Sequence, residues 1–114
     1  MRIRNATRDT ELAGEAWEAR GLVRRTIGLL GRSSLKPGEA LVLKPCNSVH
    51  TAFMRFTIDV AYVDVTGCIV KTAPDLKPFR MSGVLRPSCS VIELPGGTLE
   101  RTGTAAGDQL TFEA

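Results

Sequence analysis

The sequence has few aromatic residues, a single histidine and no long apolar run. Its aromatic residues are four phenylalanines, one tryptophan and one tyrosine, so a hydrophobic core must be built mainly from aliphatic side chains. No aromatic residue lies among the basic residues between Arg20 and Lys36, although single-stranded nucleic acids are usually held by such rings. Nucleic acid is therefore not the partner we expect.

Cysteine is too sparse to stabilise the fold. Cys46, Cys68 and Cys89 form an odd number at wide spacing, which is unlike a disulfide framework. No C-x-x-C pair is present, so we expect no metal and no cofactor. Reduced thiols are typical of an intracellular environment, and we predict a cytoplasmic protein.

Membrane segments are absent from the sequence. It contains no apolar segment of about 18 residues, the length that a membrane-spanning helix requires. The first residues, Met1 to Asn5, run into charge without the apolar core of a signal peptide. We therefore expect no membrane partner.

Length and composition predict one globular domain over 1–114. The chain has 114 residues, of which 43% are apolar and 24% are charged. Its net charge of +3 is unevenly distributed, because basic residues gather in one short segment: Arg20, Arg24, Arg25, Arg32 and Lys36. This pattern is typical of a solvated helix face, and nucleic-acid binding through Arg20 to Lys36 is an alternative.

Hydrophobic periodicity predicts an α+β fold, mainly antiparallel β, with a small barrel-like sheet. Short apolar runs predict strands at 40–43, 51–56, 57–65, 68–73, 88–94 and 109–113, with brief edge strands near Ile3 and Leu12. Helical spacing predicts an amphipathic helix from Ala16 to Leu30, and Thr98 is a candidate N-cap for a short second helix at 98–102. Between Pro74 and Pro87 we expect a long irregular loop, a candidate for covering a cleft.

Several short motifs occur in a specific order along the chain. They are Val49-His50-Thr51 with Met54, Ile58-Asp59, the hairpin Val63 to Gly67, Leu76-Lys77-Pro78, Val91 to Gly97, and Gly107-Asp108. In this order they resemble the family of domain of unknown function 192. Either Ala19 to Leu22 or Thr26 to Arg32 is similar to its amino-terminal signature, whereas Phe53 to Phe56 departs from the family's Met-Lys-Asn. The resemblance implies mostly β-structure with a small helical part and no established activity.

The stretch from Pro45 to Asp59 brings a thiol, an imidazole and a carboxylate close together in the sequence. Cys46 and His50 are the residue types of a cysteine-dependent hydrolase, or two ligands of a metal site. If residues 51–59 are extended, however, Asp59 lies on the order of 30 Å from His50. We therefore favour a protein that is not an enzyme, and keep the hydrolase or metal site as an alternative.

Asp59 and Glu93 each lie in a strand with apolar neighbours, where an unpaired charge is costly. We predict that each carboxylate pairs with a basic residue, and the available partners are Arg55, Arg80, Arg86 and His50. A buried ion pair that fixes strand register is one interpretation, and a polar cleft is the other.

The favoured prediction is a non-catalytic domain that binds a small polar ligand, such as a sugar, or a protein partner. Its cleft is formed by the segment from His50 to Asp59, the loop from Pro74 to Pro87, and Glu93. The polar core of this cleft is His50, Asp59, Arg80 and Glu93. The candidate ligand-binding residues are Cys46, His50, Thr51, Met54, Asp59, Phe79, Arg80 and Glu93.

Overall fold

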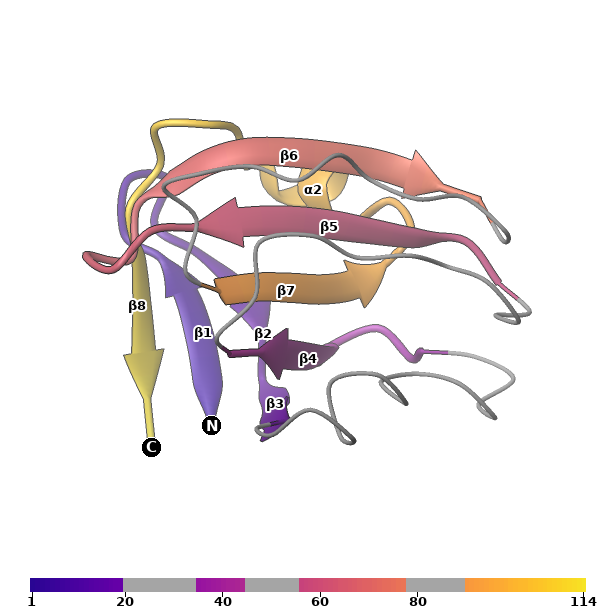
Figure 1. The fold of residues 1–114 in the computed structure, drawn as a ribbon, viewed down its shortest axis with the longest axis horizontal. Coiled ribbons are helices and arrows are strands. Elements are labelled where there is room, and N and C mark those ends of the chain that lie inside the picture. The colour runs from indigo at the N-terminus through magenta and orange to yellow at the C-terminus, as the bar shows by residue number, and fades with distance from the viewer. Residues whose placement is uncertain (20–34, 45–55, 78–89) are drawn as a thin grey trace.

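The computed structural model describes residues 1–19, 35–44, 56–77 and 90–114. The strands of these ranges are β1 (Arg2–Asn5), β2 (Thr10–Ala13), β3 (Glu15–Ala19), β4 (Glu39–Leu43), β5 (Ile58–Val63), β6 (Ile69–Leu76), β7 (Ser90–Pro95) and β8 (Leu110–Glu113). One short helix, α2, spans Thr98–Thr102 (Figure 1). The predicted α+β, mainly antiparallel class is confirmed.

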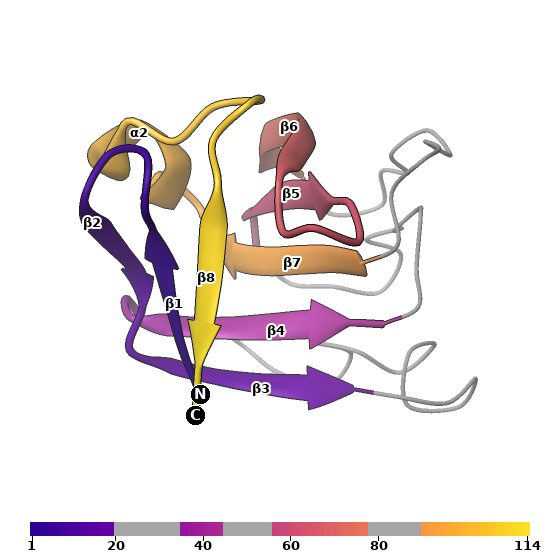
Figure 2. The same cartoon turned by 90° about the vertical axis from the view of Figure 1, so that its left-hand side faces the viewer.

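The strands form two sheets. One has three strands in the order β2-β1-β8, and the other has five in the order β3-β4-β7-β5-β6. Only β3 and β4 pair in parallel; the other pairs of described strands are antiparallel. The strands of the smaller sheet run across those of the larger one (Figure 2). An isolated bridge between Cys68 and Gln109 and several backbone hydrogen bonds, such as that from Leu110 to Gly67, link the two sheets.

The main hydrophobic core, called the inner core here, contains residues of both sheets and of α2. Every second side chain of a strand points to the same face, so alternate residues of β4, β5 and β7 contribute to it. Its members are buried aliphatic residues: Ile3, Leu12, Ala13, Ala16, Ala40, Val42, Ala61, Val63, Ile69, Ile92, Leu94, Leu99 and Leu110.

The opposite face of the five-stranded sheet, called the outer face here, carries a second apolar cluster. Its buried members are Leu35, Leu41, Leu43, Ile58, Val60, Tyr62 and Val91. All six residues of β5 are buried, which confirms the prediction of a central strand with two apolar faces. The larger sheet is therefore hydrophobic on both sides.

Two predicted elements differ from the structure. The helix predicted from Ala16 to Leu30 is wrong at its start, because Glu15–Ala19 forms β3 and pairs residue by residue with β4. The loop predicted from Pro74 to Pro87 is wrong at its start, because β6 continues to Leu76. Residues 20–34, the strand predicted at 51–55 and the rest of that loop lie outside the described residues.

The turn between β5 and β6 has the residues that the sequence predicted. Oδ1 of Asp64 accepts hydrogen bonds from the hydroxyl and amide of Thr66, at 2.7 and 2.9 Å, and from the amide of Cys68 at 3.0 Å. The bond from the Thr66 hydroxyl contributes most to a lowered pKa of Asp64. Gly67 has φ of 90°, and a Cβ there would lie 2.9 Å from the backbone carbonyl oxygen of Leu110, so this position requires glycine.

A buried polar network in the smaller sheet joins β1 to the segment that precedes β8. Oδ2 of Asp108 accepts hydrogen bonds from Nδ2 of Asn5 at 2.9 Å, from Nε of Arg8 at 3.0 Å and from the amide of Ala105 at 3.0 Å. Burial favours the neutral acid, but the hydrogen bonds from Arg8, Asn5 and Ala105 outweigh it and lower the pKa of Asp108. The network joins residues that are far apart in the sequence.

Asp108→Asn should destabilise the protein at neutral pH by about 2 kcal/mol, because it removes a charged acceptor from the buried side chain of Asn5 and from the partly buried donors of Arg8 and Ala105. The pKa of Asp108 is below 3.8 in the folded protein. The carboxylate therefore contributes stability above pH 3.8 that is lost as the pH falls through the folded pKa. Urea unfolding at neutral and acidic pH should show the gap between wild type and variant closing in acid. A matched control is Asp9→Asn, since Asp9 pairs with Arg4 at an exposed position; a gap that persists in acid would contradict the charge-based account.

Candidate functional site

Asp59 is fully buried in β5, and backbone amides satisfy its carboxylate. Oδ1 accepts a hydrogen bond from the amide of Asp75 at 2.9 Å, and Oδ2 accepts one from the amide of Leu99 at 2.8 Å. The basic partners predicted for Asp59 all lie outside the described residues, so its ion pair stays a prediction. No basic side chain is needed, because charged acceptors bind backbone N–H groups strongly.

The two backbone amides that donate to Asp59 lie where the regular hydrogen bonding of the sheet or helix is interrupted. The register between β5 and β6 shifts opposite Asp59, and Asp75 has φ of 53°, as in a β-bulge. Leu99 lies in the first turn of α2, where amides have no partner within the helix. The N-cap of α2 is Gly97 and not Thr98. Glycine has no side chain that could accept a hydrogen bond from the first turn of the helix. Asp59 is thus an architectural residue.

Glu93 is a buried acid whose Oε2 has no partner among the described residues. It is 2% exposed, and its Oε2 accepts no hydrogen bond from the described residues. Its neighbours on the adjacent strands are Leu41 and Val60, both apolar and buried. Burial in these surroundings raises the pKa of Glu93 to about 8. At neutral pH the group is mainly the neutral acid.

Asp59 and Glu93 do not share one cleft. In the register of β5 and β7, Asp59 lies opposite Leu94 and Glu93 lies opposite Val60. Leu94 belongs to the inner core and Val60 to the outer face, so the two carboxyl groups point to opposite sides of the sheet. The predicted cleft therefore cannot contain both acids on one side of the sheet.

The other predicted contacts lie outside the described residues: Cys46, His50, Thr51, Met54, Phe79 and Arg80. They stay predictions. In the described ranges, His, Cys, Asp and Glu form no group of three or more that could hold a metal ion. Within those ranges, too, no helix is long and apolar enough to cross a bilayer.

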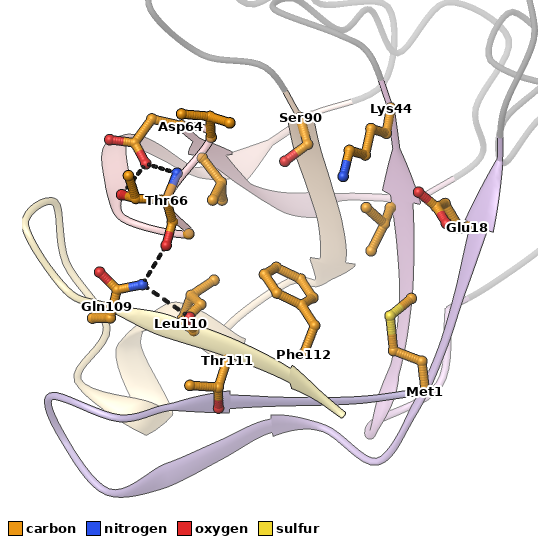
Figure 3. Close-up of a pocket in the computed structure, with 14 residues that line it drawn as sticks. Met1, Glu18, Lys44, Asp64, Thr66, Ser90, Gln109, Leu110, Thr111 and Phe112 are labelled. Carbon is orange, nitrogen blue, oxygen red and sulfur yellow. Dashed lines mark hydrogen bonds between the residues drawn. The ribbon is translucent and has the colours of Figure 1, made fainter. Parts of the chain in front are cut away.

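A groove that the sequence did not indicate lies between β8 and the five-stranded sheet (Figure 3). We call it the β8 groove; its volume is about 550 Å³. Its apolar lining includes Met1, Val42, Val63 and Phe112, and its polar lining includes Lys44, Glu18 and Ser90. The ammonium group of Lys44 and the ring of Phe112 point toward the same space (Figure 3).

The β8 groove was missed because its residues are scattered along the chain. Met1, Lys44 and Phe112 come from three strands or strand ends that only the tertiary structure brings together. Phe112 lies two residues after the buried Leu110 but is itself 40% exposed, a difference that only the structure shows. A single exposed aromatic residue is common at protein surfaces, so it does not by itself mark the groove.

Comparison with known proteins places the whole chain in one family. A UPF0127 protein from Pyrococcus furiosus is 32% identical over an alignment that covers 95% of this chain and 95% of the relative. A protein of unknown function from Novosphingobium aromaticivorans has a similar structure, with a TM-score of 0.82 at 18% identity over 97% of this chain and 82% of that one. A proposed transcription regulator from Sinorhizobium meliloti has a TM-score of 0.79 at 19% identity over 96% of this chain and 89% of that one.

The two structural likenesses show the fold alone, since their sequence identities are low. The family is shown by sequence. The model of domain of unknown function 192, described as "Uncharacterized ACR", matches residues 3–112. The chain therefore belongs to the family of domain of unknown function 192, as the order of its short motifs predicted.

Proposed function

We propose that the protein is a non-catalytic domain that binds a small polar ligand on the outer face of its five-stranded sheet, with Glu93 as the central polar contact. The observation that carries this proposal is the buried carboxyl of Glu93, whose Oε2 lacks a partner among the described residues. Buried polar atoms are nearly always hydrogen-bonded, and exceptions often mark sites of function. A bound ligand would supply the missing partner.

The protonation of Glu93 favours a neutral ligand. With a pKa of about 8, the group at neutral pH offers one O–H donor and one acceptor. Hydroxyl and amide groups complement this pair, so a sugar or a small amide fits better than an anion. A cation would instead bind the carboxylate and release a proton on binding.

The surroundings of Glu93 fit a ligand with an apolar face. Trp17 pairs with Leu41, which pairs with Glu93, so the three residues form one row across the sheet. Trp17 is 37% exposed, whereas Glu93 itself is 2% exposed, so neighbouring side chains must move for a ligand to enter. In this proposal His50, Thr51 and Arg80 remain further contacts predicted from the sequence.

Two variants of Glu93 test the proposal. A panel of neutral monosaccharides and small amides is screened by thermal shift, and Kd is measured for each hit. Glu93→Met keeps the volume but removes both polar atoms, and binding should weaken at least about tenfold. Glu93→Gln keeps a donor and an acceptor, and should bind within about threefold of wild type.

The same variants separate the proposal from its competitors. If Glu93→Met binds every hit as well as wild type, or no compound binds, Glu93 is not a ligand contact. A hit lost in both variants would need the carboxyl group itself, which would contradict recognition by a neutral donor and acceptor pair. A hydrolase using Cys46 and His50 predicts instead a thiol that reacts fast with iodoacetamide and slows in His50→Ala.

Nucleic-acid binding receives no support from the described surface of the smaller sheet. Arg2, Arg4 and Arg8 are each paired with a carboxylate, at 3.1, 2.6 and 3.0 Å. The Sinorhizobium meliloti protein is described as a proposed transcription regulator, but its 19% identity shows the fold alone. Affinity for a labelled DNA duplex that falls steeply with salt would revive this alternative.

A further inference from the structure

We infer that the β8 groove binds an extended peptide segment of a partner protein, which adds to the open edge of β8 and places an acidic side chain against Lys44. The groove lies between β8 and the five-stranded sheet, whereas Glu93 points to the outer face of that sheet. The inference is therefore independent of the function proposed above. It rests on the backbone of β8, the apolar lining and the charge of Lys44.

β8 is an edge strand, because it pairs only with β1 among the described strands. In an antiparallel pair, the amide and carbonyl of alternate residues point away from the partner strand. The amide of Ala6 donates to the carbonyl of Gln109 at 2.8 Å, so odd-numbered residues of β8 face β1. Even-numbered residues, Leu110 and Phe112, therefore direct their backbone groups to the open edge.

The turn between β5 and β6 occupies the first outward position of this edge. The amide of Leu110 donates to the carbonyl of Gly67 at 2.9 Å. Nε2 of Gln109 donates to the carbonyls of Thr66 and Leu110, at 2.7 and 3.1 Å. The pairing then stops: no described residue bonds the backbone amide or carbonyl of Phe112. An added strand can continue the ladder from that point.

The apolar lining gives an added strand something to pack against. Phe112 and Met1 are 40% and 38% exposed at the open side of the groove, and Val42 and Val63 form part of its floor. A volume of about 550 Å³ is within the usual range of ligand sites. Alternate side chains of a bound strand would point into this space, so the peptide should carry an apolar residue there.

Charge decides which peptide fits. Lys44 forms no hydrogen bond or ion pair with any described residue, although its ammonium group points into the groove. The two acids of the lining are already engaged: Asp64 holds the turn, and Glu18 has a partner of its own. The available charge is therefore positive, and an acidic side chain complements it.

The experiment starts from a phage-displayed library of random linear octapeptides, selected against the full chain. We expect enriched peptides to share an acidic residue with an apolar residue at an alternate position. One labelled peptide is then used to measure Kd by fluorescence polarisation. In amide exchange, its binding should protect the Phe112 amide, which a merely apolar contact would not do.

Matched variants test each part of the site. Lys44→Gln should weaken binding about tenfold, whereas Lys44→Arg keeps the charge and should stay within about threefold. Phe112→Pro removes the outward amide and should also weaken binding about tenfold, whereas Phe112→Leu keeps that amide and an apolar side chain. Since Lys44 is exposed and unpaired among described residues, its variants should fold normally even if Phe112→Pro does not.

Several results would overturn the inference. A selection that enriches no peptide, or peptides without an acidic preference, would remove it. Binding that is equal in Lys44→Gln and wild type would place the peptide elsewhere. If free glutarate competes as strongly as the peptide, the groove is a site for small acids and not for a strand.

Discussion

Raising the pH from about 5 to about 9 should destabilise the wild-type protein, and this loss should be largely absent in Glu93→Gln. The pKa of Glu93 rises from 4.5 in the unfolded chain to about 8 in the folded one. Between these values the folded state holds a proton that the unfolded state has released. The contribution of Glu93 to stability is therefore complete below pH 4.5 and is lost as the pH rises to about 8. The loss totals roughly 4 kcal/mol.

Urea unfolding at a series of pH values measures this effect. The free energy of unfolding of wild type should fall with pH, by about 1.4 kcal/mol per unit at the steepest. Glutamine does not titrate, so the slope assigned to Glu93 should disappear in Glu93→Gln. Glu113→Gln is the control, because Glu113 lies at the surface near Arg2 and should leave the slope unchanged. Equal slopes in wild type and Glu93→Gln would mean that the carboxyl is solvated or paired.

Sequence patterns predicted correctly those elements that are stabilised by residues close to one another in the chain. The hairpin of β5 and β6 was predicted correctly because its turn is specified by adjacent residues, Asp64 and Gly67. β3 was missed because its conformation depends on parallel pairing with β4, which begins 20 residues after β3 ends. The apolar spacing that suggested a helix there cannot report on a distant partner.

The arrangement into two sheets depended on contacts that no local pattern records. β1 pairs with β8, so the two ends of the chain form neighbouring strands. Alternation shows that a strand has two faces, but it does not show which strands share a sheet. The β8 groove lies between these sheets, and it was invisible for the same reason.

The two buried acids show what sequence reasoning can decide about the site. Both were singled out because a carboxylate among apolar strand residues is unusual in any fold, and both are buried in the structure. Their surroundings were not predictable: Asp59 meets amides freed by a bulge and a helix start, and Glu93 meets aliphatic side chains. Residues of the same chemistry thus have different roles, one in the fold and one in the proposed site.

Asp59→Asn should destabilise the protein by about 3 kcal/mol, because the new amide group opposes a buried backbone donor. Asp59 accepts from the amides of Asp75 and Leu99, and asparagine can accept from only one of them. Urea unfolding gives the loss, and faster hydrogen exchange at Leu99 should show that the start of α2 is loosened.

Asp64→Asn is the matched control for this prediction, since Asp64 also accepts backbone amides but lies in a surface turn where water can replace them. It should change the stability little. If Asp59→Asn is equally mild, the carboxylate is dispensable for the fold and the role of Asp59 must be sought in binding. A large loss with unchanged ligand affinity in the surviving folded protein would instead place Asp59 in the architecture and leave Glu93 as the described acid of the binding face.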